Sequence, residues 1–181
     1  MIFRLFRGSA NRRTVERLHG DIVAAVRQPA FFVDYAVADT FDGRFELLAL
    51  LSTLVVRRLA RLPAPGPDIA QELTDKVFQS LDDDLREMGV GDLAVPKRIK
   101  KLAAALLGRR KAYDEALESA DPTALFVALA RNVHANGLAP DDPRTPRLGR
   151  YVRAAESALS VTSLETLING PTPFPAAADI A

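Results

Sequence analysis

Hydrophobic residues recur at steps of three and four along most of the chain, which is the spacing of one face of an α-helix. Strict alternation of apolar and polar residues, which is typical of a half-buried strand, is nearly absent. The pattern therefore predicts an all-α protein of about seven helices. In chain order, the expected helices run from a Ser9 cap to a break at Gln28-Pro29, from Asp39-Thr40 to about Leu62, from near Asp68 to Gly89, from Pro96 past Leu117, from Asp121-Pro122 to near Asn136-Gly137, and from the turn at Pro140–Pro146 through Leu159, with a short helical turn over Leu164–Ile168.

The helix that begins at Asp39-Thr40 is the most apolar of these and is expected to lie at the centre of the fold. Additional leucines widen its stripe, so that the helix is apolar on most of its sides. A chain of 181 residues is long enough to form one self-sufficient compact domain. We expect three parts: a basic N-terminal segment over residues 1–8, a helical domain over 9–169, and a loose Pro- and Ala-rich tail over 170–181.

Composition excludes several kinds of chemistry. The chain has no cysteine, which excludes disulfides, thiolate zinc sites, iron–sulfur clusters and thiol nucleophiles, and two histidines are too few for a multi-histidine metal site. No apolar run reaches the roughly 20 residues that a membrane-spanning helix needs. The N-terminus also lacks the features of a signal peptide. We therefore expect a cytoplasmic protein without a metal or a cofactor.

Motifs of known catalytic sites are missing from the sequence as well. It contains no Gly-x-Ser-x-Gly, no P-loop and no Gly-x-Gly-x-x-Gly after a strand. Asp82-Asp83-Asp84 is the densest acidic cluster, but a metal site of the isoprenoid-enzyme kind needs a second facing acidic motif, and none is visible. Successive helix residues also point about 100° apart, so we expect this cluster to be a solvated, ion-paired face. The chain is predicted to be a binding protein and not an enzyme.

Charge is distributed unevenly between two neighbouring helices. Residues 68–92 carry eight acids and two bases, whereas residues 97–111 carry seven bases and no acid. A short turn folds these helices into an antiparallel hairpin with Asp84 and Glu87 opposite Lys97–Lys101. One interpretation is a set of interhelical ion pairs, each worth roughly 0–1 kcal/mol. The other is a basic strip that faces an acidic partner, anionic headgroups or RNA phosphate, because a neighbouring helix covers only one side.

The N-terminal region is also basic. Residues 1–27 contain six arginines against two acids, and apolar and aromatic residues are interleaved with the first arginines. This pattern suits contact with an anionic membrane surface. The alternative is a basic helix that packs on the domain by its apolar side.

A glycine in the first turn of the central helix is unusual. Gly43 costs up to about 1 kcal/mol relative to Ala in a helix, and it bares the backbone for close approach by another helix or by a partner. Asp39 or Thr40 is expected to cap this helix. Arg44 has a carboxylate of Asp42 or Glu46 within reach on the same helix.

Two segments of the sequence resemble signatures of the ubiquinol–cytochrome c chaperone family. The first is Asp39-Thr-Phe-Asp-Gly-Arg-Phe-Glu-Leu-Leu48. The second is Leu85-Arg-Glu-Met-Gly-Val-Gly-Asp-Leu-Ala-Val-Pro-Lys-Arg-Ile-Lys-Lys101, with Gly108-Arg109 and Tyr113-Asp114 following as in that family. The aromatic segment Phe31–Tyr35 is similar too, and the likeness spans about residues 10 to 160. The resemblance implies an all-helical assembly factor for respiratory complex III, the cytochrome bc1 complex.

The same resemblance implies partners and a location. Family members hold newly made cytochrome b, and mitochondrial members also bind the ribosome near the tunnel exit and work with a small helper protein. A bacterial version is expected to act at the cytoplasmic face of the inner membrane, as a peripheral protein. From the residues alone, an all-helical carrier of haem, quinone or lipid is the alternative. The candidate partner-binding residues are Phe31, Phe32, Tyr35, Asp42, Gly43, Arg44, Gly89, Asp92, Lys97, Arg98, Lys100 and Lys101.

Overall fold

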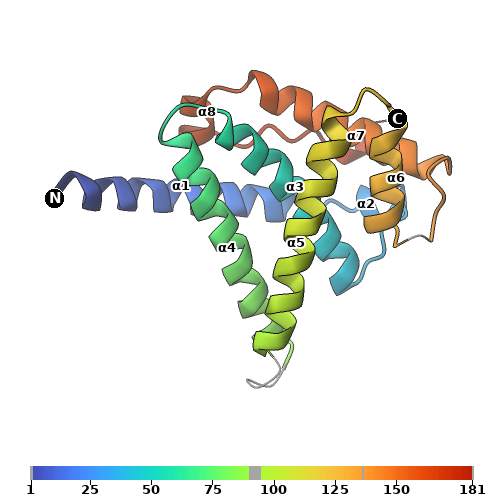
Figure 1. The fold of residues 1–181 in the computed structure, drawn as a ribbon, viewed down its shortest axis with the longest axis horizontal. Helices are drawn as coiled ribbons and strands as arrows, with labels where there is room; N and C mark the ends of the chain where they lie inside the picture. The colour runs from blue at the N-terminus through green and yellow to red at the C-terminus, as the bar shows by residue number, and fades with distance from the viewer. Residues whose placement is uncertain (1, 90–94, 136, 181) are drawn as a thin grey trace.

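A computed structural model describes residues 2–89, 95–135 and 137–180, with side chains from residue 11 onward. This part of the chain forms α-helices and one 3-10 turn, which confirms the predicted all-α class (Figure 1). The helices are α1 (Ile2–Val26), α2 (Ala30–Val33), α3 (Phe41–Ala60), α4 (Gly66–Glu87), α5 (Val95–Glu118), α6 (Thr123–Asn132), α7 (Arg144–Val161) and α8 (Leu164–Asn169), and the 3-10 turn η1 covers Ala177–Asp179.

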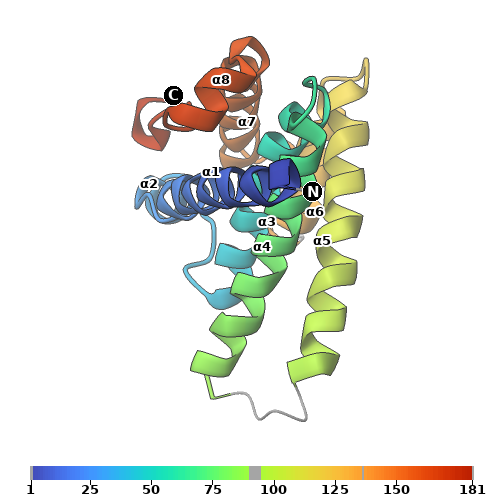
Figure 2. The ribbon, with the colours of Figure 1, turned by 90° about the vertical axis from the view of Figure 1, so that its left-hand side faces the viewer.

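The central position of α3 is confirmed. Helices α1, α4, α5 and α7 all pack against it, and the side chains of Leu47, Leu50 and Leu51 are completely buried. Each such leucine contributes about 1.5–3 kcal/mol by leaving water. Helices α4 and α5 run antiparallel as a long hairpin, and α1 crosses α4 on the other side (Figure 2).

Most helix ends lie where the sequence signals predict them. Thr40 caps α3, because its Oγ1 accepts a hydrogen bond of 3.2 Å from the backbone N–H of Gly43. Gly89 follows the end of α4 with φ of 75°, the left-handed conformation expected of a glycine after a helix. The start of α1 is different: the helix begins at Ile2, so Ser9 lies inside it and is not its cap. No proline separates residues 2–8 from the amphipathic helix that follows, so the helix continues through them.

The C-terminal segment differs from the loose tail that its composition suggests. The backbone N–H and the hydroxyl of Thr172 both donate to Asp21 Oδ2 at 2.8 Å, and the N–H of Ala177 donates to Gln28 Oε1 at 2.6 Å. The side chain of Ala177 is completely buried, and Phe174 packs against the core. The prolines prevent a regular helix, but side chains on α1 and in the turn after it bind the backbone of this segment.

An aromatic cluster lies beneath this segment. The rings of Phe31, Tyr35 and Tyr151 pack together, with centroids 4.9 Å apart for Phe31 and Tyr151. The hydroxyl of Tyr35 donates to the carbonyl of Ala177 at 2.6 Å. The cluster thus joins α2, α7 and the C-terminal segment, and it fixes the chain just before α3 begins.

Candidate functional site

The first turns of α3 are flanked by two cavities. One, the α1–α3–α4 groove, has a volume of about 210 Å³, and the other, the α3–α5–α6 cavity, has about 540 Å³. Phe45 lines both of them. The first turns of α3 belong to the segment that resembles the first family signature. The N-terminal cap of α3 positions the side chains that this helix contributes to the two cavities.

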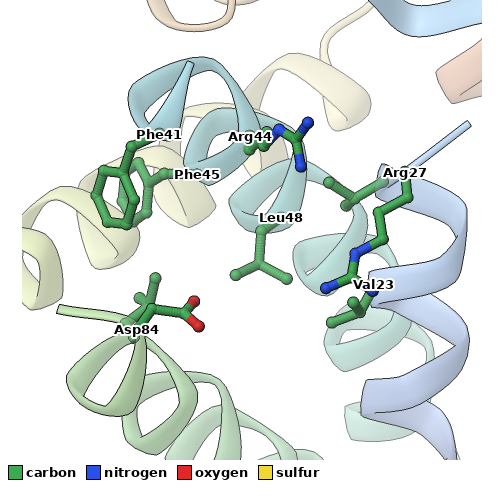
Figure 3. A pocket seen from close by; sticks show the side chains of 9 residues that line it. Val23, Arg27, Phe41, Arg44, Phe45, Leu48 and Asp84 are labelled. Carbon is green, nitrogen blue, oxygen red and sulfur yellow. The ribbon is translucent and has the colours of Figure 1, made fainter. Parts of the chain in front are cut away.

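The α1–α3–α4 groove has an apolar floor and a charged rim. Figure 3 shows Phe41, Phe45 and Leu48 on α3. Val23 on α1 and Arg27 just after that helix lie opposite them, and the carboxylate of Asp84 enters from α4. The full lining is Val23, Val26, Arg27, Phe41, Arg44, Phe45, Leu48, Leu81 and Asp84.

The rim charges of this groove differ in how they are paired. Arg44 binds Asp39 at 2.7 Å and lies over the ring of Phe32, 5.4 Å from its centroid. The partner predicted for Arg44 was Asp42 or Glu46, so that prediction is wrong. Arg27 and Asp84 have no ion-pair partner among the described residues. Two opposite charges without partners therefore remain on the rim of an apolar groove.

In the other cavity a buried ion pair joins the two family-like signatures. Arg109 Nε donates to Glu46 Oε1 at 2.8 Å and to Oε2 at 2.6 Å, and Arg109 Nη2 also contacts Oε1. Burial raises the pKa of the Glu46 carboxyl, although the hydrogen bonds from Arg109 oppose this rise. The hydrogen bonds to Glu46 raise the pKa of Arg109 in turn. The guanidinium also lies over the Phe45 ring, 5.6 Å from its centroid.

Gly43 is required by a close approach within the chain. A Cβ at this position would lie 2.0 Å from the carbonyl oxygen of Ala38, in the loop just before α3. The sequence predicted that another helix or a partner would approach the backbone at Gly43, and the structure corrects the identity of the approaching group. The approaching group is the preceding loop, and Gly43, Asp42 and Lys101 are brought together along the wall of the α3–α5–α6 cavity.

The predicted basic strip lies at the start of α5. Lys97, Arg98, Lys100 and Lys101 are all exposed, and none of them has an ion-pair partner in the described ranges. The interhelical ion pairs expected with α4 are not found there, because Asp84 points into the α1–α3–α4 groove. Gly89 is exposed at the end of the hairpin, and the remaining candidate, Asp92, lies outside the described residues.

The aromatic candidates divide into two groups. Phe31 and Tyr35 are completely buried, and they serve the core cluster. Phe32 is half-buried beneath Arg44, and its neighbour Val33 is 78% exposed. Only the surface of α2 that holds Phe32 and Val33 is therefore accessible to another protein, and it adjoins the α1–α3–α4 groove through Arg44.

Several residues of the two sites have no signal in the sequence taken alone. Val23 and Arg27 lie at the end of α1 and Asp84 lies on α4, and only the packing of α1 against α4 brings them together. Arg109 lies 63 positions from Glu46, and its place in the second family-like signature is the only local indication of a role. His134, two residues after the end of α6, also lines the α3–α5–α6 cavity.

The described residues lack two other kinds of feature. No group of three or more His, Asp or Glu side chains in them is arranged to hold a metal ion. None of their helices is long and apolar enough to cross a membrane.

Open grooves with apolar floors and charged rims are surfaces for binding other molecules, so the fold and the sites define an all-helical binding protein. The chain belongs to the ubiquinol–cytochrome c chaperone family, whose model matches residues 33–174. It is also similar to the crystal structure of the Cbp3 homolog from Brucella abortus, with 38% sequence identity, a TM-score of 0.85 and full coverage of both chains. No curated protein matches the chain. The family resemblance of the sequence is thus confirmed, and with it the class of assembly chaperones for respiratory complex III.

Proposed function

We propose that this chaperone holds newly made cytochrome b at the cytoplasmic face of the inner membrane until complex III assembles. The observation that carries the proposal is the α1–α3–α4 groove, with its apolar floor and its two unpaired charges, Arg27 and Asp84. The α3 side of the groove comes from residues 39–48, which resemble the first signature and lie within the range that the family model matches.

The chemistry of the groove suits the cytoplasmic ends of membrane-spanning helices. Such ends combine apolar side chains with Lys and Arg, which are enriched in cytoplasmic loops. The apolar ends fit the floor beside Phe41 and Leu48, and the basic residues meet Asp84 and the acidic face of α4. Helix α4, which supplies Leu81 and Asp84 to the groove, carries seven acids against two bases, so its charge attracts positively charged groups.

The exposed part of α2 extends the same surface. Val33 is 78% exposed, and Phe32 lies under the Arg44 guanidinium that borders the groove. An apolar side chain with this exposure gains free energy when a partner covers it, roughly 25 cal/mol for each Å² removed from water. Helix α2 and the groove therefore form one continuous client surface.

The basic strip has a separate task in this proposal. Lys97, Arg98 and Lys100 have no partner ion among the described residues, and each contributes about 1 kcal/mol of attraction to an anionic membrane surface. Peripheral binding through the strip keeps the chaperone at the membrane where cytochrome b is made.

A site-specific photo-crosslinker tests the client surface. The crosslinking residue replaces Val23, which lines the groove, and in a matched control it replaces Val127, which is 51% exposed on α6. Newly translated cytochrome b is then offered to each variant. The proposal expects a crosslink from position 23 and little from position 127. Equal crosslinking from both positions, or crosslinking from position 127 alone, would overturn the assignment of this groove.

A further inference from the structure

Two charges of opposite sign lie on opposite sides of the α1–α3–α4 groove. Arg27 follows the end of α1 and Asp84 lies on α4, and both residues are exposed. Figure 3 shows the guanidinium of Arg27 and the carboxylate of Asp84 directed toward one another, with the Leu48 side chain between them. Within the described part of the chain neither charge has an ion-pair partner, so both are available to another molecule.

The histidine near Asp84 does not neutralise it. Burial lowers the pKa of His19, the charge of Lys76 lowers it further, and Glu16 and Asp84 oppose that shift. The ring is therefore neutral at pH 7, and its Nε2 lies 3.0 Å from Ser80 Oγ. Lys76 is itself paired with Glu16 at 3.0 Å. Asp84 is thus left as the negative group of the groove.

The guanidinium of Arg27 is likewise not used by its own helix. The backbone N–H groups of Arg27 and Gln28 donate to carbonyls in the last turn of α1 at 3.1 to 3.2 Å, so these carbonyls do not depend on the Arg27 side chain. Arg44, the other arginine that lines the groove, is held by Asp39 at 2.7 Å. Arg27 is therefore the positive group that the groove offers to a partner.

The size of the groove limits what it can enclose. Its volume of about 210 Å³ is below the roughly 300–1,000 Å³ of a small-molecule pocket, so it suits side chains of a larger partner better than a complete ligand. The floor between the two charges is apolar, with Phe45 and Leu48 in it. A matching occupant combines an apolar side chain with one group that attracts Arg27 and another that attracts Asp84.

The two ends of a membrane-spanning helix differ in how well they match these charges. The last turn of a helix has carbonyls without intrahelical partners and about half a negative elementary charge, whereas the first turn has free N–H groups and about half a positive one. Lys and Arg are enriched beside either kind of end on the cytoplasmic side. A helix that ends there thus supplies carbonyls to Arg27 and basic side chains to Asp84. A helix that begins there supplies two positive features, and Arg27 repels both.

We propose that the α1–α3–α4 groove selects membrane-spanning helices that end at the cytoplasmic face over helices that begin there. Arg27 donates to the free carbonyls of the last turn, Asp84 pairs with the Lys or Arg that follows, and an apolar side chain of that turn packs on Leu48. The inference rests on the proposed function, because it specifies which part of the client the groove binds.

Two stapled peptides measure this selection. Both have the same apolar and basic residues, and both are acetylated and amidated, which removes the terminal charges. In one peptide the basic residues lie in the last turn, and in the other the order of residues is reversed, so the basic residues lie in the first turn. The staple keeps both peptides helical in water. By fluorescence anisotropy with the full chain, we expect the peptide with the basic last turn to bind about three- to tenfold more tightly.

Charge reversals test the role of each residue. Arg27→Glu should reverse the preference, because both charges of the groove are then negative and favour the peptide whose first turn is basic. Asp84→Lys should weaken the binding of both peptides. Asp83→Lys is the matched control, because Asp83 is exposed on the same helix but does not line the groove, and it should change the ratio of the two affinities by less than about twofold.

The crosslink of cytochrome b from position 23 separates this inference from the proposed function. If that crosslink forms while the two peptides bind equally, while neither binds, or while Arg27→Glu leaves their ratio unchanged, the selection by helix direction is overturned and the client groove stands. Crosslinked residues of cytochrome b in or just after the last turn of a spanning helix support the selection, and residues confined to first turns overturn it. Absence of both the crosslink and peptide binding overturns the groove as the client site.

Discussion

Replacing Arg109 by leucine tests the ion pair that joins the two halves of the cavity wall. The Glu46 side chain is 9% exposed, so water cannot solvate its carboxylate once the guanidinium is gone. Breaking a buried ion pair from one side costs about 3–5 kcal/mol. Arg109 is itself 26% exposed, so solvent already screens part of the interaction, and we expect a loss of about 2–3 kcal/mol.

The pH dependence of this loss has a definite sign. Burial raises the pKa of Glu46 even with Arg109 in place, and removal of Arg109 raises it further. A carboxyl whose pKa is higher in the folded than in the unfolded state favours folding when protonated, and this contribution is lost as pH rises through the folded pKa. The difference in unfolding free energy between the Arg109→Leu variant and the parent should therefore be smallest near pH 4–5 and largest above pH 7.

Urea unfolding at several pH values measures both effects. Arg110→Leu is the matched control, because Arg110 is 45% exposed and lies 3.9 Å from Asp114, so it should change stability by less than about 0.5 kcal/mol. The double variant Glu46→Leu/Arg109→Leu should recover most of the stability, since it leaves no buried charge unpaired. A stability of Arg109→Leu within 0.5 kcal/mol of the parent, or a loss that does not vary with pH, would refute this reasoning.

Three further predictions concern the glycine, the C-terminal segment and the basic strip. Gly43→Ala should destabilise the protein by about 1–3 kcal/mol in urea unfolding, because the added Cβ would lie 2.0 Å from the Ala38 carbonyl oxygen. The control Gly20→Ala, where nothing lies within 4 Å of the added Cβ, should stabilise it by about 0.5–1 kcal/mol. An unchanged stability of Gly43→Ala would contradict the close approach. Removal of residues 170–181 should lower the thermal midpoint by about 5 °C, because Tyr35 loses its hydrogen bond to Ala177 and Asp21 loses those from Thr172. An unchanged midpoint would show that the segment does not stabilise the fold. Charge reversal of Lys97, Lys100 and Lys101 should abolish sedimentation with phosphatidylglycerol vesicles while circular dichroism stays unchanged, and retained sedimentation would exclude the strip as the membrane contact.

The helices could be predicted from the sequence because their signals are local. Apolar steps of three and four, the Thr40 cap and Gly89 each act within a few residues, and all of them lie where the structure has the corresponding helix or helix end. The start of α1 and the packed C-terminal segment were harder to predict. The second depends on Asp21 and Gln28, which lie about 150 positions away from the backbone that they bind.

The sites were less predictable, because they depend on how helices pack. Asp84 was expected to face α5, yet the crossing of α1 over α4 turns it into the α1–α3–α4 groove. Arg44 was predicted to pair with Asp42 or Glu46 on its own helix, whereas it binds Asp39, and Glu46 binds Arg109 from α5. A local charge pattern gives candidate pairs, but burial decides which pair forms. The signatures pointed to the correct region of the chain without giving these contacts.

Assembly of complex III in a respiring bacterium that lacks this chain tests the central claim most directly. The bacterium is supplied with the parent chain, with the Val23→Lys variant or with the control variant Val127→Lys. Its membranes are then assayed for cytochrome b absorbance and for ubiquinol–cytochrome c reductase activity. We predict that both signals fall in the absence of the chain, return with the parent and with Val127→Lys, and stay low with Val23→Lys, whose charge occupies the apolar groove. Normal cytochrome b and normal reductase activity without the chain would contradict its role as an assembly chaperone.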